Sequence, residues 1–278
     1  MRELRGKAAF ITGGASGIGL AMGRAFAECG MKVMLADIEQ GALDRACRDL
    51  SGLGADVRGV ACDVADPDSV DRAAEATFAA FGNVHVLCNN AGVASGGGID
   101  TISIDNWRWV VDVNLMGVVY GIRSFLPHMR AHGEGGHIVN TASMAGMING
   151  MGFSPYAATK FAVVSMSEGL ALQLQPHGIG VSVLCPAYVR TRIGESGRNR
   201  TERYGKAQRL DPNSPAAALV AEVARLIEAG LDPAEVAKRV LAAIREDQLY
   251  IFTHPNMREW TDGRFAAIQA AMDGVTAP

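Results

Sequence analysis

Short apolar runs alternate with longer amphipathic stretches along almost the whole chain. The apolar runs predict strands at 8–12, 32–36, 57–62, 84–88, 137–141, 180–185 and 249–252. Helical spacing of apolar positions predicts helices at 20–29, 104–132, 155–175 and 215–229. A further helical stretch follows Asp37 and runs to residue 50, and another helix begins at residue 67. Strands that alternate with helices of this length form a parallel sheet covered on both faces. We therefore expect an α/β fold, a doubly wound domain with a mostly parallel sheet.

The same pattern predicts one domain over residues 1–278, because no stretch has the composition of an interdomain linker. Helix starts are marked by a capping side chain followed by proline at Asp66-Pro67, Ser214-Pro215 and Asp232-Pro233. Residues 191–231 combine a breaker-rich, charged segment with an apolar helix, and we expect them to form a lid. Residues 253–278 form a C-terminal tail.

Charge and cysteine usage narrow the class of protein. The 278 residues carry 26 Lys and Arg against 29 Asp and Glu, a net charge of −3, which argues against nucleic-acid binding by phosphate neutralisation. The apolar runs are too short for a membrane span, and the N-terminus lacks the apolar core of a secretory signal. Five scattered cysteines without metal-ligand spacing fit reduced thiols. We expect a cytoplasmic protein that binds neither nucleic acid nor membrane.

A glycine-rich turn follows the first predicted strand. Gly13, Gly17 and Gly19 have the spacing G-x-x-x-G-x-G, with Ser16 and Ile18 between them, and the turn opens the first helix. A tight turn at a helix N-terminus presents free N–H groups to a dinucleotide pyrophosphate. In this strand–turn–helix position the glycines predict a Rossmann-type cofactor site.

Two carboxylates follow the second and third strands. Asp37 can accept hydrogen bonds from an adenosine ribose and would repel a 2′-phosphate, which favours NAD over NADP. No Arg or Lys lies in the glycine turn or directly after Asp37. The alternative is that Asp37 only caps the next helix. Asp63, followed by Val64, suits the adenine edge in a similar way, or serves as a simple cap.

Tyr156 and Lys160 lie four residues apart in a predicted helix, so their side chains share one face. Ser143 comes just after the fifth strand, at the carboxyl edge of the sheet, where ligands bind in such folds. An adjacent ammonium and an oxidised nicotinamide would favour the phenolate and lower the pKa of Tyr156. The tyrosine could then exchange a proton with an alcohol whose oxygen is also bound by Ser143.

Two other chemistries fit the sequence poorly. Ser143 has no G-x-S-x-G surroundings and no S-x-x-K lysine, so a nucleophilic serine is not indicated. His128 and His132 share a helix face, but no third ligand accompanies them, and histidines in a last helical turn favour the helix dipole. No metal is expected.

Together these residues resemble the short-chain dehydrogenase/reductase family over about residues 6–255. The resemblance includes the glycine turn, Asp37, Asp63-Val64, Asn89-Asn90-Ala91-Gly92, Asn114, Ser143, Tyr156, Lys160 and Pro186 to Thr191. It implies that Asn90, Ala91 and Gly92 line the cofactor and that Asn114 holds a water linking Lys160 to solvent. Lys160 would also bind the nicotinamide ribose, while Pro186, Val189 and Thr191 border the nicotinamide. Pro186-Ala187 replaces the family's usual Pro-Gly.

The resemblance implies an NAD-dependent oxidoreductase that interconverts a secondary alcohol and a ketone. The alternative from another class is a non-catalytic NAD-binding redox sensor, which would be expected to have lost one of Asn114, Ser143, Tyr156 or Lys160. All four are present.

The expected small-molecule substrate is neutral and either hydrophobic or aromatic. Residues 144–153 carry three methionines and a phenylalanine, and they form either core packing or one wall of an apolar pocket. Residues 94–98 and 188–193 would supply the other walls, and no arginine cluster converges near Ser143. The arrangement is similar to a bacterial subgroup that includes dehydrogenases of lignin-derived aryl alcohols.

The resemblance also implies a homodimer or a homotetramer, with interfaces formed by 104–132, 155–175 and the last strand. In the tail, Trp260, Phe265, Ile268 and Met272 are predicted to form an apolar stripe on a helix. This stripe packs either on its own subunit or against a partner.

Overall fold

The computed structural model describes residues 1–278 except 53, 151, 153, 207–212 and 276–278. Its strands are β1 (Ala8–Thr12), β2 (Lys32–Asp37), β3 (Val57–Ala61), β4 (Val86–Asn89), β5 (Gly136–Thr141), β6 (Ile179–Cys185) and β7 (Tyr250–Phe252). They form one sheet in the order β3-β2-β1-β4-β5-β6-β7, and every pairing is parallel. All seven predicted strands and the doubly wound fold are confirmed.

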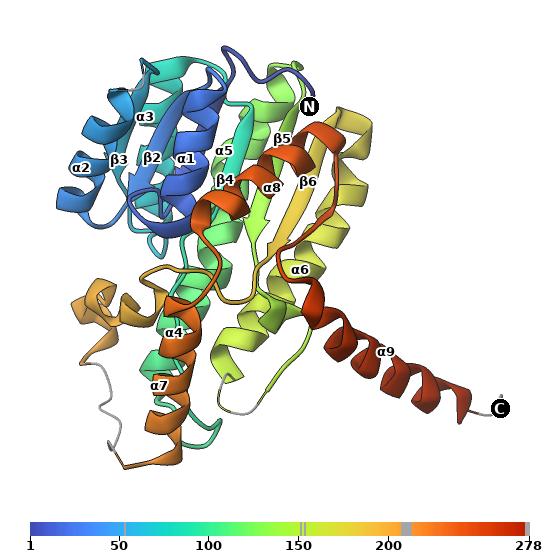
Figure 1. Ribbon diagram of the computed structural model, residues 1–278. Coiled ribbons are helices and arrows are strands. Elements are labelled where there is room, and N and C mark those ends of the chain that lie inside the picture. The colour runs from blue at the N-terminus through green and yellow to red at the C-terminus, as the bar shows by residue number, and fades with distance from the viewer. Residues whose placement is uncertain (53, 151, 153, 207–212, 276–278) are drawn as a thin grey trace.

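Helices cover both faces of this sheet (Figure 1). They are α1 (Gly17–Glu28), α2 (Gln40–Ser51), α3 (Pro67–Phe81), α4 (Ile104–Val111), α5 (Gly117–Ala131), α6 (Ser154–Leu174), α7 (Pro215–Glu228), α8 (Pro233–Glu246) and α9 (Arg258–Asp273). Short helical turns are η1 (Asp112–Met116), η2 (Met144–Gly146), η3 (Gln175–His177), η4 (Ile193–Asn199), η5 (Glu202–Tyr204) and η6 (Pro255–Met257). Helices α1, α2 and α8 share one core with the sheet, and α3, α5 and α6 share the other.

The central strands are mostly apolar because both of their faces are covered, although β4 and β5 also bury polar residues such as Asn89, His137 and Asn140. Successive side chains of β1 enter different cores: Ala9 and Ile11 pack beneath α1, whereas Phe10 contacts Phe125 of α5 with ring centroids 4.4 Å apart. Asp66 accepts a hydrogen bond from the Asp68 amide, Ser214 accepts one from the Ala217 amide and Asp232 accepts one from the Ala234 amide, so all three predicted helix caps are confirmed.

The predicted helix 104–132 is not a uniform α-helix. A π-helical turn, η1, interrupts it at Asp112–Met116 and separates α4 from α5. By length and composition alone the run Ile104–Ala131 could cross a membrane, but half of its most apolar window is buried in the protein. It packs on the sheet and α3, as a core helix does.

Helix α9 leaves the body of the molecule (Figure 1). Among the described residues, none of its side chains is buried, and Trp260 is 68% exposed. Phe265, Ile268 and Met272 are also exposed, so the apolar stripe does not pack on its own subunit.

The order of the strands places the ligand site. Chain order reverses between β1 and β4, which opens a crevice at their carboxyl ends. The glycine turn follows β1, Asn90 follows β4, Ser143 follows β5 and Pro186 follows β6. The predicted site residues therefore share one edge of the sheet.

Candidate active site

Ser143, Tyr156 and Lys160 come together at this edge. Tyr156 and Lys160 share one face of α6, with the Lys160 ammonium 5.6 Å from the centre of the tyrosine ring. Ser143 hydrogen-bonds Tyr156 and begins the turn η2, where its Oγ accepts from the Ala145 amide at 3.1 Å. The Lys160 ammonium donates to the Thr141 carbonyl at 2.8 Å, which leaves two of its three protons for other acceptors.

Burial dominates the protonation of this pair. It lowers the pKa of Lys160 from 10.5 to about 8. Burial also raises the pKa of Tyr156, and the hydrogen bond from Ser143 opposes it only in part. Without cofactor, desolvation of the buried phenolate is the largest influence on the pKa of Tyr156. The expectation that the Lys160 ammonium and an oxidised nicotinamide together lower the pKa of Tyr156 concerns the protein with bound cofactor, and it stays a prediction.

Asn114 is completely buried within the π-helical turn η1. Its amide accepts from the Val93 N–H at 2.8 Å and donates to the Val93 carbonyl at 2.9 Å, with a longer contact to Thr159. The side chain thus holds the segment after β4, beside Gly92. The Asn114 side-chain oxygen keeps a second lone pair for a further donor such as a water, and π turns are frequent at such functional positions.

The glycine turn forms a cradle that only these glycines permit. Gly13 and Gly17 have φ values of +62° and +53°, in the left-handed region. A Cβ on Gly19 would lie 2.1 Å from the Gly13 carbonyl oxygen, and a Cβ on Gly17 would lie 3.0 Å from Thr191. Ser16 precedes α1 and makes no capping hydrogen bond through its side chain, while Ile18 packs on the core. This cradle at a helix N-terminus fits a dinucleotide pyrophosphate.

The segment after β4 is fastened to the glycine turn. Thr12 Oγ1 accepts from the amides of Asn90 and Ala91, at 2.9 and 3.0 Å. The side-chain amide of Asn90 donates to the Thr12 carbonyl at 3.0 Å, and its oxygen accepts from the Thr141 hydroxyl at 3.3 Å. A Cβ on Gly92 would meet Asn114 and Lys160 at 3.4 and 3.6 Å. Asn90, Ala91 and Gly92 therefore join the glycine turn to the surroundings of Lys160.

Asp37 is buried at the end of β2 and does more than cap a helix. One carboxylate oxygen accepts from the Ala15 amide in the glycine turn and the other from the Glu39 amide, both at 3.0 Å. Each oxygen keeps a lone pair for a further donor. Asp37 thus stands beside the cradle, as an acceptor for ribose hydroxyls requires.

Asp63 serves two purposes. One of its oxygens accepts from the Ala65 amide at 3.0 Å, while the other binds Arg203 at 3.1 Å, an ion pair that the sequence alone did not predict. Val64 is buried and packs against Gly117. A Cβ added to Gly117 would lie only 3.0 Å from the Val64 side chain.

The loop after β6 closes the other side of the crevice. The Pro186 carbonyl accepts from the Met144 amide at 2.9 Å and from Ser143 Oγ at 3.4 Å. Val189 is buried and pairs with Leu231, and Thr191 touches Gly17. The loop therefore links the turn that carries Ser143 to the start of α1.

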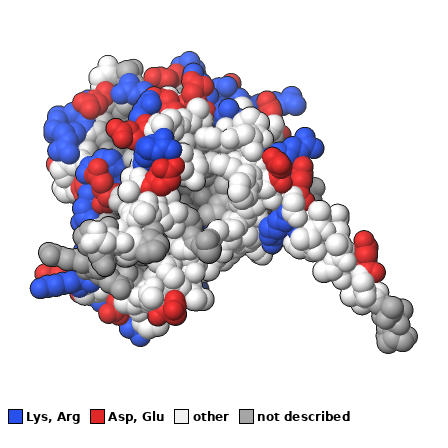
Figure 2. Space-filling model, turned by 60° about the horizontal axis from the view of Figure 1, so that its bottom comes forward, with Lys and Arg blue, Asp and Glu red and all other residues white. Residues whose placement is uncertain are grey.

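Figure 2 shows this face of the molecule hollowed near its centre, with charged residues mostly around the rim. Of the expected walls, Met144 is buried in the core, whereas Met147 is only partly buried. Met151 and Phe153 lie outside the described residues, as do 207–212 of the predicted lid and 276–278 of the tail.

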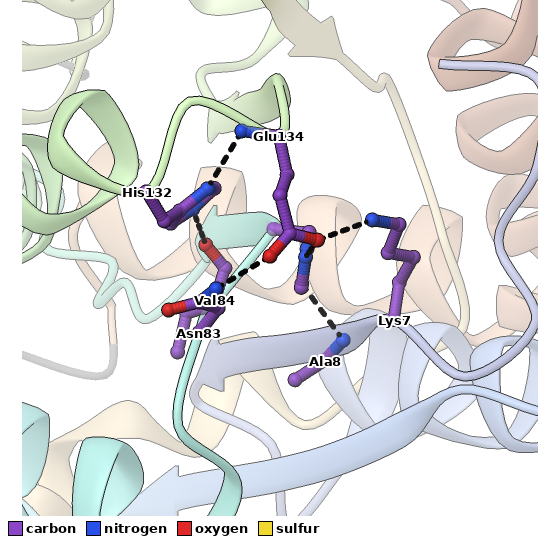
Figure 3. Close-up of polar contacts among 7 residues, drawn as sticks. Lys7, Ala8, Asn83, Val84, His132 and Glu134 are labelled. Carbon is purple, nitrogen blue, oxygen red and sulfur yellow. Dashed lines mark hydrogen bonds and ion pairs between the residues drawn. The ribbon is translucent and has the colours of Figure 1, made fainter.

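A polar cluster lies at the amino ends of the strands, opposite to the candidate active site (Figure 3). His85, His132 and Glu134 are close enough to hold a metal ion. However, the Glu134 carboxylate already binds Lys7 at 2.7 Å, His85 at 2.9 Å and Asn83. His85 accepts from the Ala8 amide through Nδ1, and His132 contacts the Val84 carbonyl at 3.0 Å and accepts from the Glu134 amide. These partners explain the cluster as a structural network and make a metal site unnecessary.

This network predicts a pH-dependent contribution to stability. Lys7, His85 and Asn83 lower the pKa of Glu134 from 4.5 to about 2, so its contribution is complete above pH 4.5 and is lost as the pH falls towards 2. We expect Glu134→Gln to lower the Tm modestly at pH 7, with the difference from the wild type shrinking below pH 4.5. Thermal denaturation between pH 7 and pH 3 measures it, with Glu75→Gln on α3 as the control. A difference that stayed constant with pH would contradict this assignment.

Comparison with known proteins agrees with the geometry. The family model described as short chain dehydrogenase matches residues 7–202. The chain is 35% identical to the C alpha-dehydrogenase of Sphingobium sp. strain SYK-6, over 96% of this chain and 87% of that protein. It is 36% identical to 3beta-hydroxysteroid dehydrogenase 2 of Eggerthella lenta, over 72% of this chain and 77% of that protein.

Solved structures give the same result. A short chain dehydrogenase/reductase from Burkholderia phymatum in complex with NAD superposes with a TM-score of 0.93 at 40% identity, covering 100% of this chain and 99% of that one. The fold, the nicotinamide cofactor and an oxidoreductase activity follow from these matches. The chain belongs to the short-chain dehydrogenase/reductase family.

Proposed function

We propose that the protein is an NAD-preferring dehydrogenase that interconverts a secondary alcohol and a ketone. One observation carries the proposal: Ser143, Tyr156 and Lys160 converge at the sheet edge that also holds the glycine cradle. When bound there, the nicotinamide ring accepts or returns a hydride. The protein's own task is to bind the alcohol oxygen and move its proton.

Each side chain has a separate role in this proton transfer. Ser143 donates a hydrogen bond to the substrate oxygen and keeps it beside Tyr156. Tyr156 removes the hydroxyl proton during oxidation and returns it during reduction. Because burial alone raises the pKa of Tyr156, the phenolate depends on the Lys160 charge and on the positive charge of the oxidised cofactor. Lys160 also binds the nicotinamide ribose, and Asn114 holds the segment that positions this lysine.

The substrate that we propose is neutral and hydrophobic or aromatic. The hollow at the carboxyl edge is bordered mainly by uncharged residues (Figure 2). Two relatives support this direction, because one is named as a C alpha-dehydrogenase and the other as a hydroxysteroid dehydrogenase. The retention of Asn114, Ser143, Tyr156 and Lys160 argues against the alternative of a non-catalytic NAD-binding sensor.

The first test follows reduced nicotinamide by absorbance with NAD or NADP and a panel of secondary alcohols, from small aliphatic to bulky aryl compounds. We expect turnover with NAD and the bulky alcohols. A preference for small charged hydroxy acids would overturn the proposed substrate class. Binding of NAD without turnover of any alcohol in the panel would favour the sensor.

Asp37 is expected to set the preference for NAD. Its buried carboxylate accepts ribose hydroxyls and repels a 2′-phosphate. We expect Asp37→Asn to raise kcat/KM for NADP by about tenfold, since one charge repulsion of this size is ~1.4 kcal/mol. The matched control is Asp49→Asn on α2, which makes the same charge change at an exposed site. Unchanged cofactor preference in the Asp37 variant would show that its role is only to hold the glycine turn.

A further inference from the structure

Residues 193–204, here called the strap, leave β6 and run across the carboxyl ends of other strands. The strap contains η4 and η5 and is gold in Figure 1, where it lies below the ends of β2 and β3. Its contacts reach the segments that follow β4, β2 and β3. Because β1 lies between β4 and β2 in the sheet, the strap spans the half of the crevice that contains the glycine turn.

The strap is fastened at its start by Ser196. This side chain is 3% exposed, accepts from the Ala94 amide at 2.9 Å and donates to the Ala94 carbonyl at 3.3 Å. Ala94 follows the cofactor-lining segment Asn90-Ala91-Gly92, so this contact fixes the strap above the centre of the crevice.

Two arginines fasten the strap to acids on the adenosine side. Arg198 binds Glu39 at 2.8 Å and also donates to the Arg192 carbonyl at 3.1 Å. Arg203 binds Asp63 at 3.1 Å. In the Arg198–Glu39 pair the two side chains are 24% and 30% exposed. In the Arg203–Asp63 pair they are 43% and 26% exposed, so solvent screens the Arg198–Glu39 pair less.

Glu39 and Asp63 belong to the turns that carry the two residues expected to bind the adenosine half of the cofactor. The Glu39 amide donates to Asp37, and Asp63 itself is the residue assigned to the adenine edge. The strap and the adenosine half of the cofactor therefore depend on the same two turns. If the cofactor binds beneath the strap, at least one of the two arginine contacts has to open before the cofactor leaves.

The far end of the strap is held independently of the crevice. Tyr204 donates to Asp112 at 2.9 Å, and Arg200 donates to Asn106 at 2.6 Å while stacking over the Trp109 ring. This end stays attached to α4 and η1 when the arginine pairs break. Breaking the two arginine pairs therefore leaves the contacts of Arg200 and Tyr204 in place.

We propose that the strap retains the dinucleotide, with Arg198 and Arg203 as positioning residues whose ion pairs to Glu39 and Asp63 limit the rate at which reduced cofactor dissociates. The inference rests on NAD binding and is independent of the alcohol that is oxidised. It differs from the lid expected over the substrate, because these contacts lie along the cofactor half of the crevice.

The test measures NADH dissociation by stopped-flow fluorescence, with displacement by excess NAD. We expect Arg198→Ala to raise the dissociation rate by about two- to fivefold, the range of a partly exposed ion pair. Glu39→Gln should raise it similarly, and the double variant should add little more, since both changes break the same pair. Arg225→Ala, which removes an exposed pair with Glu222 on α7, is the control and should leave the rate unchanged.

The Glu39 variant separates retention from simple charge attraction. If Arg198 acts only as a positive charge near the anionic cofactor, Glu39→Gln will slow dissociation, and the proposal is overturned. Hydrogen exchange supplies a second readout: strap amides should be protected in the wild type with NADH and lose that protection in Arg198→Ala. Equal protection in both proteins would also overturn it. Because only binding is measured, failure of the alcohol assay leaves this result interpretable.

Discussion

Replacing Tyr156 by phenylalanine is expected to lower kcat for alcohol oxidation by roughly 10²- to 10⁴-fold, the usual contribution of a positioned acid–base group. The ring remains and continues to pack beside Lys160, so only the hydroxyl that carries the proton is lost. NADH affinity and Tm should change little. Steady-state kinetics, fluorescence titration and thermal denaturation measure these three quantities on one preparation.

The matched control is Tyr120→Phe on α5, which removes the same hydroxyl outside the candidate active site. It should retain wild-type turnover. Unimpaired turnover in Tyr156→Phe would exclude the tyrosine as the proton carrier. A parallel loss of NADH binding would instead assign it a structural role.

Gly19→Ala is the second large effect that we expect. The new Cβ would lie 2.1 Å from the Gly13 carbonyl oxygen and 2.7 Å from the Asn90 side chain, so the backbone of the glycine turn must move. Amides of the displaced turn would lose hydrogen bonds to the charged pyrophosphate, each worth about 1.5–3 kcal/mol, and we expect NADH binding to weaken roughly ten- to a hundredfold. The strain should also lower the free energy of unfolding by about 1–3 kcal/mol.

Gly169→Ala tests the same substitution without the contact. Gly169 lies inside α6, is exposed and has open space where a Cβ would stand. Alanine there should raise the free energy of unfolding by about 0.5–1 kcal/mol and leave NADH binding unchanged. If Gly19→Ala bound NADH as tightly as this control does, the glycine turn would not be the pyrophosphate cradle.

The fold and the meeting of the candidate catalytic residues were predictable because their signals are local. Apolar strands alternating with helices require a covered parallel sheet, and in such a sheet the carboxyl ends of all strands meet at one edge. The glycine turn follows β1, and Ser143 follows β5. Tyr156 and Lys160 share a helix face through their spacing alone. The sequence could therefore place these groups together without any knowledge of side-chain contacts.

Local pattern was insufficient where the backbone departs from regular geometry or where burial outweighs charge. The helical spacing of 104–132 continues through η1, so it gave no sign of the π turn that holds Asn114. Spacing also placed an ammonium near Tyr156, but only the structure shows that the ammonium faces the ring and that burial raises the tyrosine pKa.

By itself, then, the sequence determined the doubly wound sheet, the glycine cradle and the Ser143, Tyr156 and Lys160 set, since periodicity and short spacings specify them. Only the tertiary structure decided which distant charges meet. No basic residue directly follows Asp37 in the sequence, yet Arg198 reaches Glu39 across 159 positions, and Arg203 reaches Asp63 across 140. The reason is physical: the path of a loop depends on the packing of the whole domain, whereas a strand or a helix turn depends on its neighbours along the chain.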